Sequence, residues 1–373
     1  MNTSIIEHFS SLKDPRIERK KLHALMDIIV LVVCGIISGA EGWEAIEEFG
    51  HEKEKWLRKF IPLKNGIPSH DCIAYVISRL SVKGFQECFM SWTQAVTEKV
   101  GGQVISVDGK TARGSKDSKN NRSPLHMVSA WASESHLVLG QEATEEKSNE
   151  ITTIPKLLAL LELEGCIVTI DAMGCQRTIT KQIIDQGGDY SIGLKGNQGL
   201  LHEAVVDFFD TSEKHEYAHV KYDFAEEIDK GHGRLETRRY WITEDLTTLP
   251  DVEKWVGLKS IGMVERVCLT GEKETVERRY FINSFAADAR IFAKAVREHW
   301  GVENRLHWRL DVVFREDESR IRKANAPAIM TTIRHLCMGL FDADPTPISL
   351  AKKRRKASWS DSYRAKLVFG LKF

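Results

Sequence analysis

Three carboxylates in the sequence suggest a site for divalent metal ions. Asp108 ends the apolar run V-I-S-V-D, Asp171 ends the run C-I-V-T-I-D, and Glu303 lies in the helical stretch H-W-G-V-E-N-R-L-H-W. Magnesium prefers hard oxygen ligands and keeps some of its waters, so two or three carboxylates suffice to bind it. Two such ions, Mg²⁺ or Mn²⁺, about 4 Å apart can activate a water or hydroxyl and stabilise a leaving oxygen. The pattern therefore predicts phosphodiester chemistry.

Each aspartate follows a run that is typical of a buried β-strand. Adjacent strand ends would place both carboxylates in one crevice. A single aspartate after a strand is more often a turn former or a helix cap, so Asp108 and Asp171 gain weight only as a pair in a suitable strand order. The segment G-K-T-A-R-G-S follows Asp108. Gly109 permits close backbone approach, and Lys110 and Arg113 could meet phosphates.

The third acid shares a predicted helix with other polar side chains. Residues that are four apart lie on the same face of a helix. This spacing predicts a common face for His299, Glu303, His307 and Asp311. A zinc site on the two histidines is one alternative, but their spacing is not the i,i+4 pair of zinc proteases. An exposed polar stripe is another. Aromatic and aliphatic residues surround the helix, so we expect a largely buried helix, where an acid needs a metal or a base as partner. Asp311 is an alternative to Glu303 as the third carboxylate of the metal site.

Two further polar segments could contact a nucleic acid. In L-K-G-N-Q, Lys195, Asn197 and Gln198 follow a predicted strand, although a plain polar loop explains them equally well. In G-H-G-R-L-E-T-R-R, residues 231–239, alternation places several charges on one strand face, where they either bind phosphates or pair with each other across a hairpin. The side chains in question are His232, Arg234, Glu236 and Arg238. The chain has no phosphate-binding P-loop and no dinucleotide fingerprint.

Composition is that of a globular protein without a global charge excess. The 373 residues include 53 Lys and Arg and 53 Asp and Glu, which gives a net charge of zero. Residues 346–373 are locally basic, with K-K-R-R-K at 352–356, and we expect either a polyanion-binding or a solvated C-terminal tail. Seven scattered cysteines predict reduced cytosolic thiols. The apolar segment 28–40 is too short to span a bilayer, so we expect a cytoplasmic protein without membrane contact.

The order of predicted elements indicates an α/β fold. Residues 1–100 are helical and look like an accessory domain, and the pattern changes at Gly101. Strands and helices then follow in the order β-β-β-α-β-α-β over residues 104–194, which predicts a mixed sheet flanked by helices, as in the ribonuclease H-like fold. Residues 200–285 are strand-like and suggest a β-rich insertion before a long helix at 286–312 and another after Pro327. We expect a catalytic domain over residues 101–345.

The motifs together resemble the DDE transposases of bacterial insertion sequences, and in particular the subgroup with the H-repeat-associated proteins. The resemblance rests on V-D-G-K, T-I-D-A, D-Y-S-I-G-L-K-G-N-Q, H-G-R-L-E-T-R and H-W-G-V-E-N-R-L-H-W-R-L-D, with D-P-R and G-I-P-S-H-D near the N-terminus. It implies Asp108, Asp171 and Glu303 as catalytic and metal-binding residues. Related groups carry Arg four residues before the Glu and Lys seven after it, where this chain has His299 and Leu310. We therefore expect His299, Asn304 and His307 to make the DNA contacts instead.

The resemblance implies DNA cleavage at element ends, followed by attack of the freed 3′-hydroxyl on target DNA. The expected partners are double-stranded DNA, as terminal inverted repeats and as target, and a second copy of the chain in the DNA complex. The expected location is the bacterial cytoplasm, at the nucleoid. Two alternatives stay open: a metal-dependent nuclease that joins no strands, and a degenerate transposase that only binds DNA.

Overall fold

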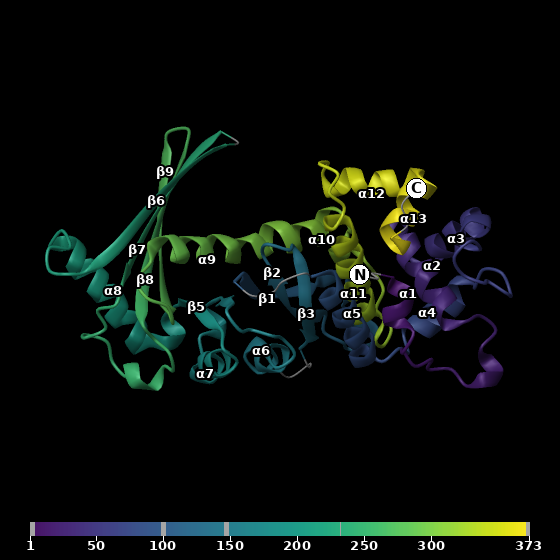
Figure 1. The fold of residues 1–373 in the computed structure, drawn as a ribbon, viewed down its shortest axis with the longest axis horizontal. Helices are drawn as coiled ribbons and strands as arrows, with labels where there is room; N and C mark the ends of the chain where they lie inside the picture. Colours follow the sequence, from purple (N-terminus) through teal and green to yellow (C-terminus); the bar gives the residue numbers. More distant parts are fainter. Residues whose placement is uncertain (1–3, 98–101, 145–148, 232, 371–373) are drawn as a thin grey trace.

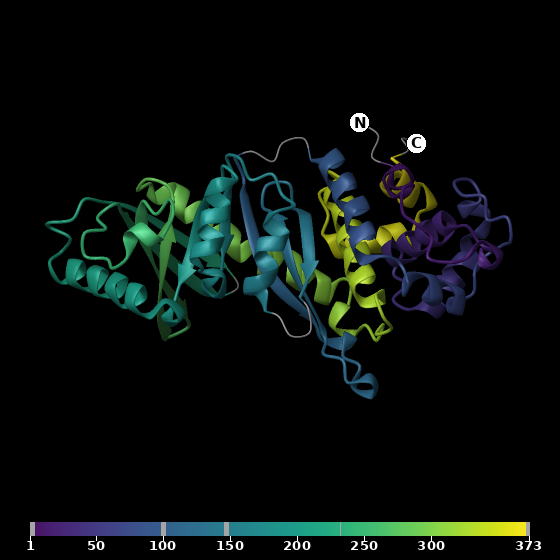
Figure 2. The same ribbon diagram turned by 90° about the horizontal axis from the view of Figure 1, so that it is seen from below.

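The chain forms an elongated molecule with helices at one end and a sheet through the rest (Figures 1 and 2). The computed structural model describes residues 4–97, 102–144, 149–231 and 233–370. The α-helices are α1 (Ile5–Phe9), α2 (Leu25–Ile37), α3 (Trp43–Leu57), α4 (His70–Ile77), α5 (Val82–Val96), α6 (Glu150–Leu158), α7 (Arg177–Asp185), α8 (Gly199–Lys214), α9 (Ala289–Gly301), α10 (Trp308–Val312), α11 (Ala326–Asp342), α12 (Leu350–Trp359) and α13 (Asp361–Phe369). Helix α9 runs along the sheet and joins its far end to the helical end (Figure 1).

One sheet of nine strands extends through the middle and the far end of the molecule. Its strands are β1 (Val104–Ala112), β2 (Leu125–Ala132), β3 (Leu137–Ala143), β4 (Ile167–Ile170), β5 (Asp189–Leu194), β6 (Tyr222–Gly231), β7 (Arg234–Thr243), β8 (Ser260–Thr270) and β9 (Lys273–Asn283). Their spatial order is β3-β2-β1-β4-β5-β9-β8-β7-β6. Strand β1 is antiparallel to β2 and parallel to β4, and β4 is parallel to β5. The mixed sheet predicted from the sequence is therefore confirmed.

Helices cover both faces of this sheet. Ile105 and Val107 of β1 pack in the same apolar core as Ile154 and Leu157 of α6. On the opposite face, the Ser106 hydroxyl donates a hydrogen bond to the Glu298 carbonyl oxygen of α9, at 3.2 Å. Because side chains alternate along a strand, Asp108 lies on the face that α9 covers and Gly109 on the face of α6.

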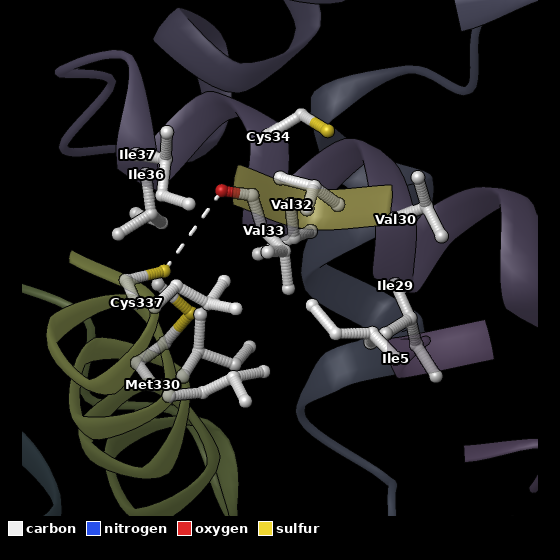
Figure 3. Packing of buried hydrophobic residues seen from close by; sticks show 14 of the residues in the cluster. Ile5, Ile29, Val30, Val32, Val33, Cys34, Ile36, Ile37, Met330 and Cys337 are labelled. Atoms are coloured by element: carbon white, nitrogen blue, oxygen red, sulfur yellow. Dashed lines mark hydrogen bonds between the residues drawn. The ribbon is translucent and has the colours of Figure 1, made fainter. Parts of the chain in front are cut away.

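The helical end is built from both ends of the chain. Helices α1–α5 share one apolar core with α11, α12 and α13. Helix α2 is buried on every side, and its Val33 carbonyl oxygen accepts a bond from the Cys337 thiol of α11 at 3.9 Å (Figure 3). Among the described residues, no helix has the length and apolar character needed to cross a membrane.

The β-rich segment predicted before the long helix contains β6–β9 and continues the central sheet, because β9 pairs with β5. Two features of the fold differ from the sequence predictions. Helix α8 lies in a region that the sequence predicted as strand-like. Residues 350–369 form helices rather than a solvated tail, and the basic side chains of Lys353, Arg354 and Arg364 are buried. The Arg354 Nε donates to the Ile36 carbonyl oxygen at 3.2 Å, which ties α12 to α2.

A buried polar cluster joins α11 to the sheet. His335 of α11 is hydrogen-bonded through Nδ1 to Gln141 of β3, and Gln141 in turn donates to the Thr332 hydroxyl. Glu316 accepts bonds from Thr331 and Arg334 of the same helix, and these contacts help to hold the pKa of its carboxyl below the ordinary value despite burial. Burial lowers the pKa of His335 to about 4. The imidazole is therefore neutral at pH 7 and gains a proton on unfolding below about pH 6.5.

The cluster predicts a specific pH dependence of stability. The unfolded chain binds more protons than the folded one between the folded pKa of about 4 and the unfolded pKa of about 6.5, so His335 contributes stability above this window that is lost as the pH falls through it. His335→Gln removes this titration and costs about 1–3 kcal/mol at pH 7 through altered packing and hydrogen bonding. We expect the gap in unfolding free energy between wild type and variant to narrow by about 2 kcal/mol from pH 7 to pH 5.

Denaturant titrations at both pH values measure this gap. The exposed His219 serves as the matched control, because His219→Gln should keep a constant offset from wild type. A gap between wild type and His335→Gln that stays constant or widens on acidification would contradict the assignment.

Candidate active site

Asp108 and Asp171 lie at neighbouring positions, where the parallel pairing of β1 with β4 stops. Asp171 follows β4, but β1 continues to Ala112, so the prediction that Asp108 ends its strand is wrong. The parallel pairing of β1 with β4 ends at the pair Val107 and Ile170, so each aspartate is the next residue in its chain. The Asp171 Oδ1 accepts bonds from the backbone amides of Met173 and Gly174, at 3.0 and 3.4 Å, as the cap of a short 3₁₀ turn. Its Oδ2 takes part in neither bond.

Asp108 is held in an environment that disfavours its charged form. Burial, together with the nearby carboxylates of Glu150, Asp171 and Glu303, raises the pKa of Asp108 to about 7, against the effect of a bond from the Gly109 amide. Burial and Glu150 also raise the pKa of Asp171. The acids are therefore close enough to repel one another, and a cation among them would stabilise all the charged forms.

Glu303 lies in a π-helical turn that interrupts the long helix. The structure has α9 up to Gly301, a π-helix over Val302–His307, and then α10. A π-helix holds more residues per turn than an α-helix, and such turns occur often at functional sites. Although the turn interrupts the helix, the four side chains predicted to share a face all approach β1 and β4. His299, His307 and Asp311 contact Thr169, Asp108 and Lys110 in turn. Glu303 is exposed, borders a groove and acts on the charge of Asp108.

The two histidines of this helix face the protein rather than solvent. The His299 Nδ1 lies 3.1 Å from the Thr169 hydroxyl of β4, and burial lowers the pKa of His299 to about 4. The His307 Nδ1 lies 3.6 Å from Asp108 Oδ2, and burial and Lys110 lower its pKa to about 4. Both rings are therefore neutral at pH 7. In this arrangement they pack behind Asp108 and Asp171, and the predicted DNA contacts of His299 and His307 would require them to move.

Lys110 is surrounded by acids. Its Nζ lies 2.7 Å from Asp311 Oδ1, 3.3 Å from Glu316 Oε2 and 3.4 Å from Asp317 Oδ1. The side chain is mostly buried, so it ties β1 to the segment that follows α10 and is not free for a phosphate. Asp311 in turn has a cation as partner. Arg113, by contrast, keeps 83% of its side chain exposed beside Asp317, at 3.5 Å.

The polar loop after β5 supports the loop that follows Asp171. The Asn197 amide donates to the Ala172 carbonyl oxygen at 2.7 Å, and the Gln198 amide donates to the Cys175 carbonyl oxygen at 2.8 Å. Lys195 is exposed, and its charge favours the ionised form of Asp171. Of the three residues predicted from L-K-G-N-Q, the structure thus places Lys195 beside the site and uses both amides to shape its backbone.

A groove of about 740 Å³ lies between the sheet extension and the π-helical turn. We call it the arginine groove, because its lining includes seven cations against four acids. The cations are Lys230, Arg234, Arg238, Arg266, Arg279, Arg297 and Arg305, and the acids are Asp229, Glu236, Glu298 and Glu303. The guanidinium groups of Arg238 and Arg279 lie 5.7 and 5.0 Å from the Trp300 ring centroid. Asn304 also lines this groove, while His232 lies outside the described residues.

Ion pairs inside the arginine groove fix several of these side chains. Arg238 pairs with Asp229 at 2.7 Å and also with Glu236. Arg266 pairs with Glu236 at 2.9 Å, whereas Arg234 lies 3.6 Å from it. The pairing of arginine with glutamate that the sequence offered as one explanation is therefore present, and it lies within the groove that Glu303 borders.

One acid at the site was not predicted from the sequence. Glu150, the first residue of α6, accepts a bond from His126 Nε2 at 2.7 Å and influences both aspartates. The only signal in the sequence is its place at a predicted helix start, which is common for acids. Within the described ranges, no three His, Cys, Asp or Glu side chains converge closely enough to hold a metal ion as they stand, on the histidines or on the carboxylates.

Comparison with known proteins assigns the chain to a family. The model of the transposase DDE domain matches residues 99–340, and a model described as DDE_Tnp_1-associated matches residues 6–93. The chain is 41% identical to "H repeat-associated putative transposase YhhI" of Escherichia coli K12, over 98% of each chain. It is 40% identical to "Putative transposase YncI" of Escherichia coli O157:H7, over 96% of this chain and 93% of that one. The chain therefore belongs to the DDE transposase family, in the group that includes the H-repeat-associated proteins.

Proposed function

We propose that the protein cleaves DNA at the ends of an insertion element and transfers the freed strands into target DNA. The observation that carries this proposal is the pair of aspartates at the point where the pairing of β1 with β4 stops, next to the groove that Glu303 borders. The antiparallel β3-β2-β1 unit followed by parallel β4 and β5 supports a ribonuclease H-like fold for this part of the sheet.

The site suits a divalent cation by its donor chemistry. Asp108, Asp171 and Glu303 offer hard carboxylate oxygens, and their mutual repulsion shows a local lack of positive charge. We assign these three residues as the ligands of Mg²⁺ or Mn²⁺, with two ions as the expected number. When bound, the metal would act as a Lewis acid and stabilise charge on the attacking and leaving oxygens.

The residues around the site have separate roles in this proposal. Asp108 and Asp171 are fixed by the sheet and by the turn after β4, and Glu303 approaches from the π-helical turn. Lys195 is an exposed cation near Asp171, and Arg113 is an exposed cation beside Asp317; both suit phosphate contacts. Asn304, Arg234 and Arg238 line the arginine groove. The groove would receive the DNA backbone, because arginine pairs with phosphate through two parallel hydrogen bonds.

The chemistry has two steps that conserve the number of phosphorus–oxygen bonds. In the first, a water oxygen attacks the phosphorus at the element end, and the bond to the 3′-oxygen breaks, leaving a 3′-hydroxyl. In the second, this hydroxyl attacks a target phosphodiester, forms a new bond to phosphorus and releases the target's own 3′-hydroxyl. A neutral Asp108 carboxyl would bind metal poorly, so deprotonation and metal binding are coupled there.

Several broader features remain parts of the proposal. We take residues 101–345 as the catalytic unit and residues 1–100 as accessory, with helices α12 and α13 joined to the accessory part through their shared core. Two copies of the chain would act on the two element ends, in the bacterial cytoplasm at the nucleoid.

Replacing Asp171 tests the assignment directly. Asp171→Asn should reduce Mg²⁺-dependent nicking of duplex DNA that carries the element ends by roughly 10²–10³-fold, because metal stabilisation of the transition state is worth several kcal/mol. The control is Asp207→Asn, at an exposed position of α8, which should nick like wild type. Equal activity in wild type and Asp171→Asn would sink the proposal. Cut ends that never join to an added target duplex would favour the nuclease alternative instead.

A second pair of variants separates Glu303 from its competitor. Glu303→Gln should reduce nicking about as strongly as Asp171→Asn, since it removes a proposed ligand. Asp311→Asn should cost roughly tenfold or less, because Asp311 pairs with Lys110 and acts only on the position of β1. The measurement is the nicking rate of each variant at saturating Mg²⁺. A larger loss in Asp311→Asn than in Glu303→Gln would make Asp311, and not Glu303, the third metal ligand.

A further inference from the structure

Glu150 is attached to the strand that carries Asp108. Its Oε1 accepts a bond from His126 Nε2 at 2.7 Å, and His126 Nδ1 lies 2.8 Å from the Thr111 hydroxyl. Thr111 and His126 are direct partners in the pairing of β1 with β2. Since a carboxylate can only accept, Nε2 of the ring donates, and in a neutral ring Nδ1 accepts from Thr111. This chain of two bonds fixes the Glu150 carboxylate against β1.

The carboxylate packs directly on the backbone that follows Asp108. A Cβ atom on Gly109 would overlap with both Glu150 Oε1 and His126 Nε2. Only a residue without a side chain therefore allows the approach, which accounts for glycine next to Asp108 in V-D-G-K. Because β4 ends beside Val107, the edge of β1 beyond this point is not covered by it. Glu150 and Asp108 can meet around this open edge, although they approach from different faces of the sheet.

The electrostatics agree with this placement. Beside the effect of burial, Glu150 raises the pKa of both aspartates, and among the acids that act on Asp108 its influence is the largest. Glu303 is a weaker neighbour of Asp108. An acid that only stabilises the N-terminus of α6 would interact with the backbone amides of the first turn and with nothing else. Glu150 instead acts on the charge of two other acids and is hydrogen-bonded to a histidine.

We propose that Glu150 is a fourth carboxylate ligand of the divalent cation at Asp108 and Asp171, with His126 as its positioning residue. The inference rests on the proposed metal-dependent function. It assigns Glu150 Oε2, which takes no part in the bond to His126, to the cation or to one of its waters. Magnesium accepts such ligation, because it binds carboxylates while keeping several waters.

The test is calorimetric titration of the full-length protein with Mn²⁺ in the absence of DNA. Glu150→Gln keeps the shape of the side chain and its bond to His126 but removes the charge, so we expect the Kd for Mn²⁺ to rise by roughly tenfold or more. Glu162→Gln, at an exposed position shortly after α6, is the matched control and should bind Mn²⁺ like wild type. Asp108→Asn should abolish binding.

The positioning role of His126 has its own readout. His126→Ala should weaken Mn²⁺ binding by roughly tenfold, and His126→Gln, which can still donate to Glu150, should restore part of it. Combined with Glu150→Gln, His126→Ala should add little, because both changes remove one interaction. Unfolding midpoints of all variants identify any that fail to fold, and Glu150→Asp, which keeps the charge on a shorter side chain, should bind with intermediate affinity.

The outcomes separate the inference from the proposed function. Wild-type affinity in Glu150→Gln, together with lost binding in Asp108→Asn, would overturn the role of Glu150 and leave the function standing. No Mn²⁺ uptake by the wild-type protein would overturn both. Equal losses in Glu150→Gln and the Glu162→Gln control would show that charge at a distance, and not ligation, accounts for the effect, and would also overturn the inference.

Discussion

The unequal lengths of β1 and β4 are the constraint on which the candidate site depends. Strand β1 pairs with β2 along Ile105–Ala112, but with β4 only as far as Val107. The backbone of β1 therefore continues beyond β4 with one edge uncovered, and Asp108 is the first residue at this opening. Asp171 follows the last residue of β4 and lies opposite Asp108, and Glu150, the first residue of α6, packs on the next residue of β1, Gly109. An arrangement of repelling acids persists because the apolar strands and helices beneath it fix the backbone.

The two aspartates and Glu303 are held in different ways, and this has consequences for the site. Asp171 is fixed by backbone amides and Asp108 by the sheet, whereas Glu303 is exposed on a π-helical turn. Helix α9 before the turn packs on β1 and on the sheet extension, through Phe292 and Tyr240 among others, and α10 after it connects to Lys110. The π-helical turn thus lies between two segments that are packed on the sheet, and it leaves Glu303 exposed, unlike the two aspartates.

The sequence predicted most of the local structure but little of the long-range packing. Apolar runs identified β1, β4 and β5, and a turn-bounded pair identified β2 and β3, because buried strands have a distinct pattern. Within the strand-like region 200–285, β6 has only a weak apolar alternation, at Tyr222, Phe224 and Ile228, and its side chains are nearly all exposed, so it was not predicted as a separate strand. Helix α8 could have been found, since Leu201, Val205, Phe208 and Phe209 have helical spacing. The basic run in α12 suggested a solvated tail because the carbonyl partners of Arg354 and Lys353 lie in other elements.

Within the site, the sequence correctly placed Asp171 after a buried strand, whereas Asp108 lies inside β1, which continues to Ala112 beyond the apolar run. On the helix of Glu303, the spacing of four correctly directed the predicted side chains toward β1 and β4, but it gave no sign of the π-helical turn that carries Glu303. Glu150 was also invisible, because its link to β1 runs through His126 on another strand. The resemblance to a family supplied Glu303, while spacing alone left Asp311 as an equal choice.

The distribution of charge around the site explains why a net charge of zero says little about function. Lys110 lies two residues after Asp108 in the chain, yet its charge pairs with Asp311, Glu316 and Asp317. Lys195 is a nearby cation for Asp171. The pKa of Asp108 is raised by burial and by repulsion from the neighbouring acids. A few residues away, cations outnumber acids in the arginine groove. Negative charge at the candidate site and positive charge along the adjoining groove are what a metal ion and a polyanion would each require.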